Sequence, residues 1–141
     1  MKHAKVLPIE KIGGLGQEKF DTIIMFGNNF GLFGSFQKAK TLLGKIHKIT
    51  SPEAVIIAES NDPYKTSDPA HISYHKLNRR RGRMPGQLRI RIRFSMYVGE
   101  WFDYLLVSKG EMERILENTG WKIGQFVDSG KSSYVAIIEK E

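Results

Sequence analysis

The sequence of 141 residues contains no cysteine. This excludes a disulfide framework, thiolate metal ligands and thiol catalysis. No apolar run approaches the ~20 residues that a membrane helix needs. The first residues, Met1 to Pro8, carry charge but lack the apolar stretch of a signal peptide. These absences lead us to expect a cytoplasmic protein with no membrane partner.

The composition is that of a folded domain. Hydrophobic residues make up 40% of the chain, which is typical of globular and not of disordered proteins. Domains cluster at about 100–150 residues, and a chain of this length can form a core without disulfides or metals. No internal repeat or linker divides the sequence. We therefore expect residues 1–141 to form a single domain.

Hydrophobic patterning predicts strands and helices in alternation. The strand Phe20–Phe26 contains a contiguous apolar run, which indicates burial on both faces, as in a parallel sheet. Apolar residues at helical spacing predict a helix over Phe36–Lys48, and a second apolar strand follows at Ala54–Ala58. Strand, helix and strand make a βαβ unit, which should be right-handed. Ala4–Leu7 could add a short strand.

The middle of the chain predicts a helix and a hairpin. Asp68 as N-cap, followed by proline, starts a helix that runs to about Arg80. Leu88–Phe94 alternates apolar residues with outward arginines, as in a half-buried strand. A turn at Val98–Glu100 would return the chain as a second strand over Trp101–Val107.

The last third predicts a capped helix and an antiparallel pair. Ser108 and Glu111 fit a capping box at the helix start, and Gly120 fits its end. Two strands, Trp121–Val127 and Ser133–Ile138, then follow, joined at Asp128-Ser129-Gly130. They should pair as a closing hairpin.

Three stretches carry a resemblance to a known family. Phe20–Asn29 resembles the fourth strand and following loop of the class I S-adenosylmethionine-dependent methyltransferases. Leu116–Trp121 is similar to the helix-to-strand junction near that family's carboxyl end, and Tyr134–Ile138 to its closing strand. The resemblance implies an α/β, Rossmann-like three-layer sandwich with a mixed, mostly parallel sheet and a closing antiparallel hairpin. Residues 62–107 would be a helix-plus-hairpin insert that resembles the family's substrate lid.

The resemblance covers only the later part of that fold. The family grips its cofactor with a strand, an acidic residue and a glycine-rich loop, and with a further acidic residue after the second strand that holds the ribose. Neither part exists before Val6. The cluster Gly13-Gly14-Leu15-Gly16 comes before the buried strand instead of after one, and a lone glycine cluster is weak evidence. We therefore expect a truncated domain whose amino-terminal strands are missing.

The resemblance implies a cofactor site at the end of the first buried strand. Phe26, Gly27, Asn28 and Asn29 would line the crevice under S-adenosylmethionine, the implied cofactor. An ordinary turn, in which glycine and asparagine adopt left-handed angles, explains the same residues equally well.

Three further side chains are candidates for catalysis. Glu59 follows the next strand, where a carboxylate could orient or deprotonate a nucleophile. His71 and His75 lie four apart on one helix face. This spacing suits metal ligation, but Ile72 stands where a zinc protease has its glutamate, and no third ligand is evident, so no metal is expected. The histidines would instead face the substrate, although ordinary surface or buried histidines are commoner.

Aromatic and basic side chains leave two alternatives open. Trp101, Phe102 and Tyr104 could form a wall against a ring-bearing substrate, but core packing is the commoner role. The net charge is +7, with arginines clustered at 79–83 and alternating at 89–93. Such a cluster can bind phosphate or nucleic acid. A solvated face is the commoner explanation, and outward charges also discourage strand aggregation.

The function implied by the resemblance is methyl transfer from S-adenosylmethionine to a small molecule or a nucleic acid, which the chain would not perform alone. The alternative is a non-enzymatic basic module that binds RNA or a protein partner. The missing strands leave Thr22–Phe26 with an unpaired apolar edge, which invites pairing with another chain. We therefore expect a homodimer, or a complex with a chain that supplies the missing half, with Ile23 and Met25 at or near the contact.

Overall fold

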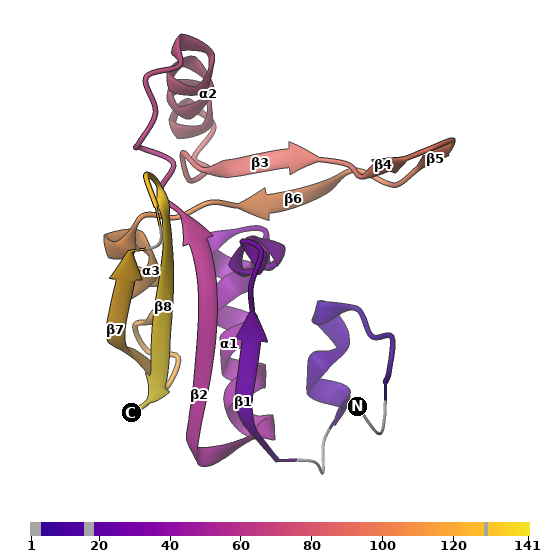
Figure 1. Ribbon diagram of the computed structural model, residues 1–141, viewed down its shortest axis with the longest axis vertical. Helices are drawn as coiled ribbons and strands as arrows, with labels where there is room; N and C mark the ends of the chain where they lie inside the picture. Colours follow the sequence, from indigo (N-terminus) through magenta and orange to yellow (C-terminus); the bar gives the residue numbers. More distant parts are fainter. Residues whose placement is uncertain (1–3, 16–18, 129) are drawn as a thin grey trace.

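The computed structural model describes residues 4–15, 19–128 and 130–141. Its centre is a four-stranded sheet in the order β1-β2-β8-β7 (Figure 1). The strands are β1 (Phe20–Met25), β2 (Thr50–Asn61), β7 (Trp121–Asp128) and β8 (Ser133–Lys140). β1 pairs with β2 in parallel, and β8 is antiparallel to both β2 and β7. The predicted mixed sheet and closing hairpin are confirmed, but only one pairing in the described sheet is parallel.

Helices α1 (Phe36–Ile49) and α3 (Lys109–Leu116) pack on one face of the sheet (Figure 1). Ser35 caps α1 by accepting a hydrogen bond from Lys38 N, and five apolar side chains of this helix are buried. The predicted capping box of α3 is present, since Ser108 and Glu111 bond each other's backbone. Both helices thus bury an apolar stripe, as their spacing predicts.

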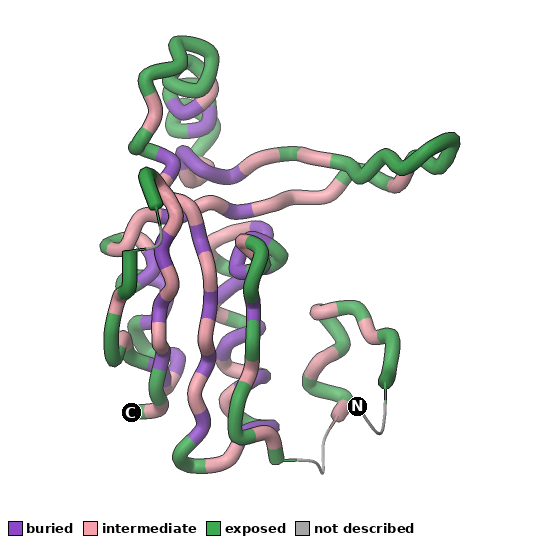
Figure 2. The backbone as a smooth tube through the Cα atoms, in the orientation of Figure 1, coloured by how far each residue is buried: buried purple, intermediate pink, exposed green. Residues whose placement is uncertain are grey.

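The opposite face of the sheet carries no helix of the described chain (Figures 1 and 2). Ile23 and Met25 of β1 face α1, whereas Ile24 is 61% and Phe26 51% exposed. The prediction that this run is buried on both faces is therefore wrong for the described residues. Of the three expected layers, they supply the sheet and one helical layer.

The core lies between the sheet and the two helices, and its aromatic side chains are hydrogen-bonded. Trp121 Nε1 donates to Leu43 O at 3.1 Å, and Tyr134 Oη donates to Val107 O at 2.8 Å. Both side chains are almost fully buried. Each ring removes apolar area from water, and its polar atom has a hydrogen-bond partner, which offsets the cost of burying that atom.

The amino-terminal strand expected at Ala4–Leu7 is absent. These residues are irregular and mostly exposed, and Val6 has no cover at all. A 3₁₀ helix, η1 (Ile9–Leu15), follows and packs beside α1, where Glu10 pairs with Lys38 at 2.6 Å. The glycine cluster lies on this helix rather than at a strand end. Gly16, like Ser129, falls outside the described residues.

The insert between β2 and α3 contains a helix and a long ribbon. α2 (Pro69–Arg80) has the predicted bounds and N-cap. The ribbon pairs β3 (Gln87–Ile90) with β6 (Phe102–Leu105), and β4 (Arg93–Phe94) with β5 (Tyr97–Val98). It crosses the carboxyl ends of β2 and β1 and projects beyond β1 (Figure 1).

The predicted turn of the hairpin is displaced, and β2 is longer than predicted. The hairpin reverses at Ser95 and Met96, where Ser95 has a φ of 52°, and not at Val98–Glu100. β2 begins at Thr50, four residues before the predicted start at Ala54. The β1–β2 register shifts past Pro52, because proline cannot donate to a ladder. No helix in the described residues has the length and apolarity to cross a membrane.

Candidate functional site

The loop after β1 is held in a strained turn at the carboxyl edge of the sheet. Gly27 and Asn28 have φ values of 67° and 63°. This left-handed geometry is open to glycine and, at modest cost, to asparagine. Asn28 is the N-cap residue of a second 3₁₀ helix, η2 (Asn29–Phe33), although its side chain makes no capping hydrogen bond. The sequence pattern therefore fixes the direction in which the chain leaves the sheet.

Glu59 at the end of β2 locks this loop in place. Its Oε2 accepts a hydrogen bond from Gly27 N at 2.7 Å, and its Oε1 accepts one from Ser133 Oγ at 3.0 Å. The carboxylate thus joins β1, β2 and β8. The structure places Glu59 beside the predicted cofactor loop, where both its oxygens are engaged in positioning.

Tyr104 of β6 clamps the ribbon onto the same loop. Its Oη donates to Asn28 O at 2.5 Å, and a Cβ on Gly31 would lie 2.5 Å from the ring. Burial raises the pKa of Tyr104, an effect that the bond to Asn28 opposes and Glu59 reinforces. The amide oxygen of Asn28 is buried and has no hydrogen-bond partner. Native structures leave few buried polar atoms unpaired, so this turn is a place to look for a ligand.

His71 and His75 line a cavity of ≈ 560 Å³ between α2, β3 and the carboxyl end of β2. His71 Nδ1 lies 3.0 Å from Thr66 Oγ1. Burial lowers the pKa of His75, as do Arg79 and His71, so its imidazole stays neutral near pH 7. The other side chains that shape the walls include Asn61, Asp62, Lys65, Tyr74, Leu88 and Ile90.

The predicted catalytic residues therefore fall into two groups. Glu59 lies with the 26–29 loop, while the two histidines lie in the cavity. The ribbon connects the two groups. Leu88 lines the cavity and is paired with Tyr104, and Tyr104 bonds Asn28 of the loop. Among the described residues, no cluster of three His, Cys, Asp or Glu side chains could hold a metal ion.

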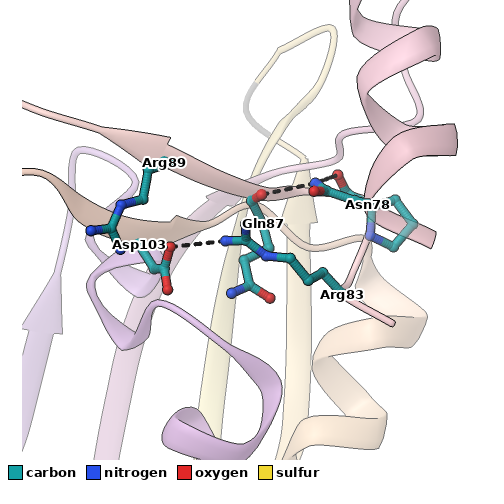
Figure 3. Close-up of polar contacts among 6 residues, drawn as sticks. Asn78, Arg83, Gln87, Arg89 and Asp103 are labelled. Carbon is teal, nitrogen blue, oxygen red and sulfur yellow. Dashed lines mark hydrogen bonds and ion pairs between the residues drawn. The ribbon is translucent and has the colours of Figure 1, made fainter. Parts of the chain in front are cut away.

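Polar contacts fix the base of the ribbon to α2 (Figure 3). Asn78 Nδ2 donates to Pro85 O at 3.0 Å and to Gln87 O at 2.8 Å, and the side chain is fully buried. Arg83 Nη2 donates to Asp103 Oδ1 at 2.9 Å, while Arg89 approaches the same oxygen at 3.5 Å. These contacts orient the ribbon over the sheet edge.

Sequence reasoning missed most of these positioning residues. Asn78 lies at a buried position of α2, where asparagine is unusual. A polar residue at a helix position expected to be buried is the one sequence feature that could have indicated its role. Nothing in the sequence distinguishes Asp103 from an ordinary strand residue, and Tyr104 was singled out only as part of an aromatic wall, not as a hydrogen-bond donor to the loop. Core packing, the commoner role for the aromatic trio, is wrong for Trp101, which is 51% exposed, while Phe102 and Tyr104 are half-buried.

No protein-family model matches the sequence, and no curated protein is significantly similar to it. Solved structures do match. A methyltransferase from Bacteroides fragilis, in complex with S-adenosylhomocysteine, is 22% identical over 87% of this chain, with a TM-score of 0.68. One from Methanosarcina mazei is 13% identical over 92%, with a TM-score of 0.64. The chain has part of a methyltransferase fold.

A third match is the 1,6-didemethyltoxoflavin-N1-methyltransferase of Burkholderia thailandensis, 12% identical over 92% of this chain, with a TM-score of 0.56. The chain spans 48%, 64% and 48% of these three proteins. The resemblance to the later part of the class I S-adenosylmethionine-dependent methyltransferases is thus confirmed at the level of the fold. The TM-scores establish similarity of fold, whereas identities of 22% or lower do not establish the activity.

Proposed function

We propose that this chain forms the acceptor-side portion of an S-adenosylmethionine-dependent methyltransferase, acting on a small molecule or a nucleic acid. The observation that carries the proposal is the locked 26–29 loop, which offers an orphaned amide oxygen at the carboxyl edge of a methyltransferase-like sheet. Ligands of open α/β sheets bind at this edge. Residues 1–141 would act as one domain, with 62–107 as the insert that covers the site.

The residues of the loop fit an adenosyl ligand. Nothing lies within 4 Å of a Cβ placed on Gly27, so a ligand can approach its backbone. Asn28 supplies the unsatisfied oxygen, and the exposed ring of Phe26 offers an apolar surface. S-adenosylmethionine, when bound, supplies an activated methyl group.

The cavity beside the loop is the proposed acceptor site. Its volume lies within the ~300–1,000 Å³ range of small-molecule pockets. Neutral His75 could accept a proton from the acceptor's nucleophilic group, and His71, held by Thr66, would orient that group. Glu59 and Tyr104 would keep the loop and the ribbon in register. The chain's contribution is then mainly positioning and exclusion of water.

The cofactor site would be incomplete without a further α/β segment along β1. The outer edge of β1 has no partner strand among the described residues, and Ile24 and Phe26 are exposed on the bare sheet face. A strand added to this edge and a helix laid on this face would cover both. The segment could come from another chain or a second copy. Met25 is already buried against α1, so Ile24 replaces it as the expected contact residue.

Binding of S-adenosylhomocysteine, followed by ¹⁵N NMR, tests the cofactor assignment. We expect weak binding, with amide shifts concentrated at Gly27, Asn28 and Asn29. Asn28→Gly keeps the left-handed backbone and deletes the amide, so it should abolish these shifts. Asn118→Gly is the matched control, because Asn118 has a φ of 60° and is exposed outside the site.

Either of two outcomes would count against this proposal. Absence of shifts at the loop would remove the cofactor assignment. One-site binding with a micromolar dissociation constant would remove the claim that the site is incomplete.

Light scattering tests the open edge. Ile24→Lys should dissociate any dimer or complex formed through β1, because it places a charge on the exposed apolar face. Ile72→Lys, at an isoleucine of α2 that is 40% exposed, should leave assembly unchanged. A wild-type chain that stays monomeric at high concentration and binds no complementing segment would contradict the proposal.

A non-enzymatic module that binds RNA or a protein partner is the second candidate function. It is supported by the ribbon beyond β3, whose side chains from 91 to 98 are all exposed. Methyl transfer that is absent even with a complementing segment would favour this candidate.

A further inference from the structure

The net charge of the chain is concentrated in one segment. Residues 69–101 contain eight lysines and arginines and a single acidic residue, Glu100. This segment therefore carries a net +7, the same as the whole chain, and the remainder is neutral. In the structure the segment comprises α2, β3, β4 and β5, which lie beyond the carboxyl ends of β1 and β2 (Figure 1).

The positive charge in this segment is arginine and not lysine. Seven of the eight arginines lie at 79–93, whereas thirteen of the fourteen lysines lie outside 69–101. Either residue would solvate a surface or attract an anionic membrane. Arginine differs in binding oxyanions through two parallel hydrogen bonds and in stacking its plane on rings. The segregation favours a ligand that offers both phosphates and flat rings.

Four of these arginines can contact a ligand: three have no side-chain partner among the described residues, and Arg91 contacts only the exposed ring of Trp101. Arg83 and Arg89 are engaged with Asp103 at the base of the ribbon, and Arg79 lies over the ring of Tyr64. By contrast, Arg80 and Arg81 are exposed where α2 ends, and Arg91 and Arg93 are exposed on the ribbon. Exposed cationic groups thus extend from the end of α2 to the outer part of the ribbon.

Exposed aromatic rings lie among these arginines. Trp101 is 51%, Tyr97 67% and Phe94 79% exposed. The guanidinium of Arg91 lies over the Trp101 ring, 4.8 Å from its centroid, so a cationic group and an aromatic ring are exposed together. A two-stranded ribbon alone is only marginally stable in water. Exposed apolar rings on it are typical of an interaction site, because a ligand that covers them removes their surface from water.

We propose that the ribbon (residues 87–105) and the end of α2 bind single-stranded nucleic acid. Arg80, Arg81 and Arg93 contact phosphates, while bases stack on the rings of Tyr97 and Trp101 and on the guanidinium of Arg91. Proteins that bind single strands without sequence preference combine these two elements, a cationic track and stacking rings. This surface lies outside the proposed methyl-transfer site and functions whether or not that site is active.

Fluorescence anisotropy with a labelled oligouridylate of about 20 nucleotides tests the proposal. The triple variant Arg80→Gln, Arg81→Gln and Arg93→Gln should weaken binding at least tenfold. It should also reduce the slope of log K against log salt by about 2, since each phosphate contact to a single strand contributes about 0.7. The matched control removes three exposed lysines elsewhere, through Lys48→Gln, Lys122→Gln and Lys131→Gln.

Two single variants test the stacking. Trp101→Ala should weaken binding about tenfold, because a stacked base contributes about 1–3 kcal/mol. Trp101→Phe should restore most of it. Circular dichroism of each variant checks that the fold is intact, and the exposed positions of the substituted residues make loss of folding unexpected.

Four outcomes would overturn the proposal. They are no binding at about 50 mM salt, equal weakening by the lysine control, equal affinity for a duplex of the same length, and retained affinity in Trp101→Ala. Vesicles with and without anionic lipid provide a further comparison. Arginine-dependent binding to anionic vesicles, with no binding to the oligonucleotide, would assign the surface to a membrane instead.

Discussion

The sheet with its two helices and the insert above it are held together by different forces. α1 buries five apolar side chains, whereas the only buried residues of α2 are His75 and Asn78. In the sheet and its helices, stability comes from apolar area removed from water. In the insert, apart from Leu105 and Val107 at its end, which are buried in the core, it comes from a few directed bonds at the base of the ribbon. This difference predicts that the insert loosens without unfolding the sheet.

The largest expected effect separates these two regions by packing. Leu43→Ala in α1 removes a fully buried side chain, and we expect a loss of about 3 kcal/mol in the free energy of unfolding. The same change at Leu77 of α2, which is 39% exposed, should cost less than about 0.5 kcal/mol. Urea denaturation measures both. Equal losses would mean that α2 is packed as tightly as α1.

A second prediction concerns the polar base of the insert. Asn78→Ala removes the donors to Pro85 O and Gln87 O, leaving two buried carbonyls unsatisfied. Each unsatisfied buried group costs about 1–3 kcal/mol. Hydrogen exchange should accelerate in β3 and β6 and stay unchanged in β2 and β8. Uniform acceleration over the whole chain would show that the insert and the sheet unfold as one unit.

The same contrast explains how much the sequence could predict. β1, α1, β2, α2, α3, β7 and β8 were all predicted, because hydrophobic period and capping residues are local signals. Burial of Ile24 and the turn at Ser95 were not predicted correctly. The first depends on which layers cover the sheet, and the second on the pairing of two exposed strands, so neither is encoded by local pattern.

The candidate site was predicted in the same uneven way. The loop at 26–29 and its neighbour Glu59 follow strands that the sequence reveals, so their meeting at one sheet edge was predictable. The clamp by Tyr104 and the ion pair between Arg83 and Asp103 join residues 20 to 76 positions apart. Such contacts follow from the path of the ribbon, which single-sequence patterns do not determine.

A smaller effect tests the link between the two regions. Tyr104→Phe removes the bond to Asn28 O and leaves the ring packed on Gly31. We expect a loss of about 1 kcal/mol and faster exchange of the amides of η2. Phe102→Leu, on the same ribbon face, is the control and should leave η2 exchange unchanged. Unaltered η2 exchange in Tyr104→Phe would show that the ribbon does not hold the loop.

The smallest effect uses one histidine in each region. Burial is the main cause that lowers the pKa of both His47, next to Trp121, and His75 in the insert. Because the unfolded chain then takes up protons first, stability should fall as pH drops below about 6.5. His47→Gln should flatten this dependence for global unfolding, and His75→Gln should flatten it for exchange of the insert alone. If His75→Gln instead changed the pH dependence of global unfolding, the insert would open only with the sheet.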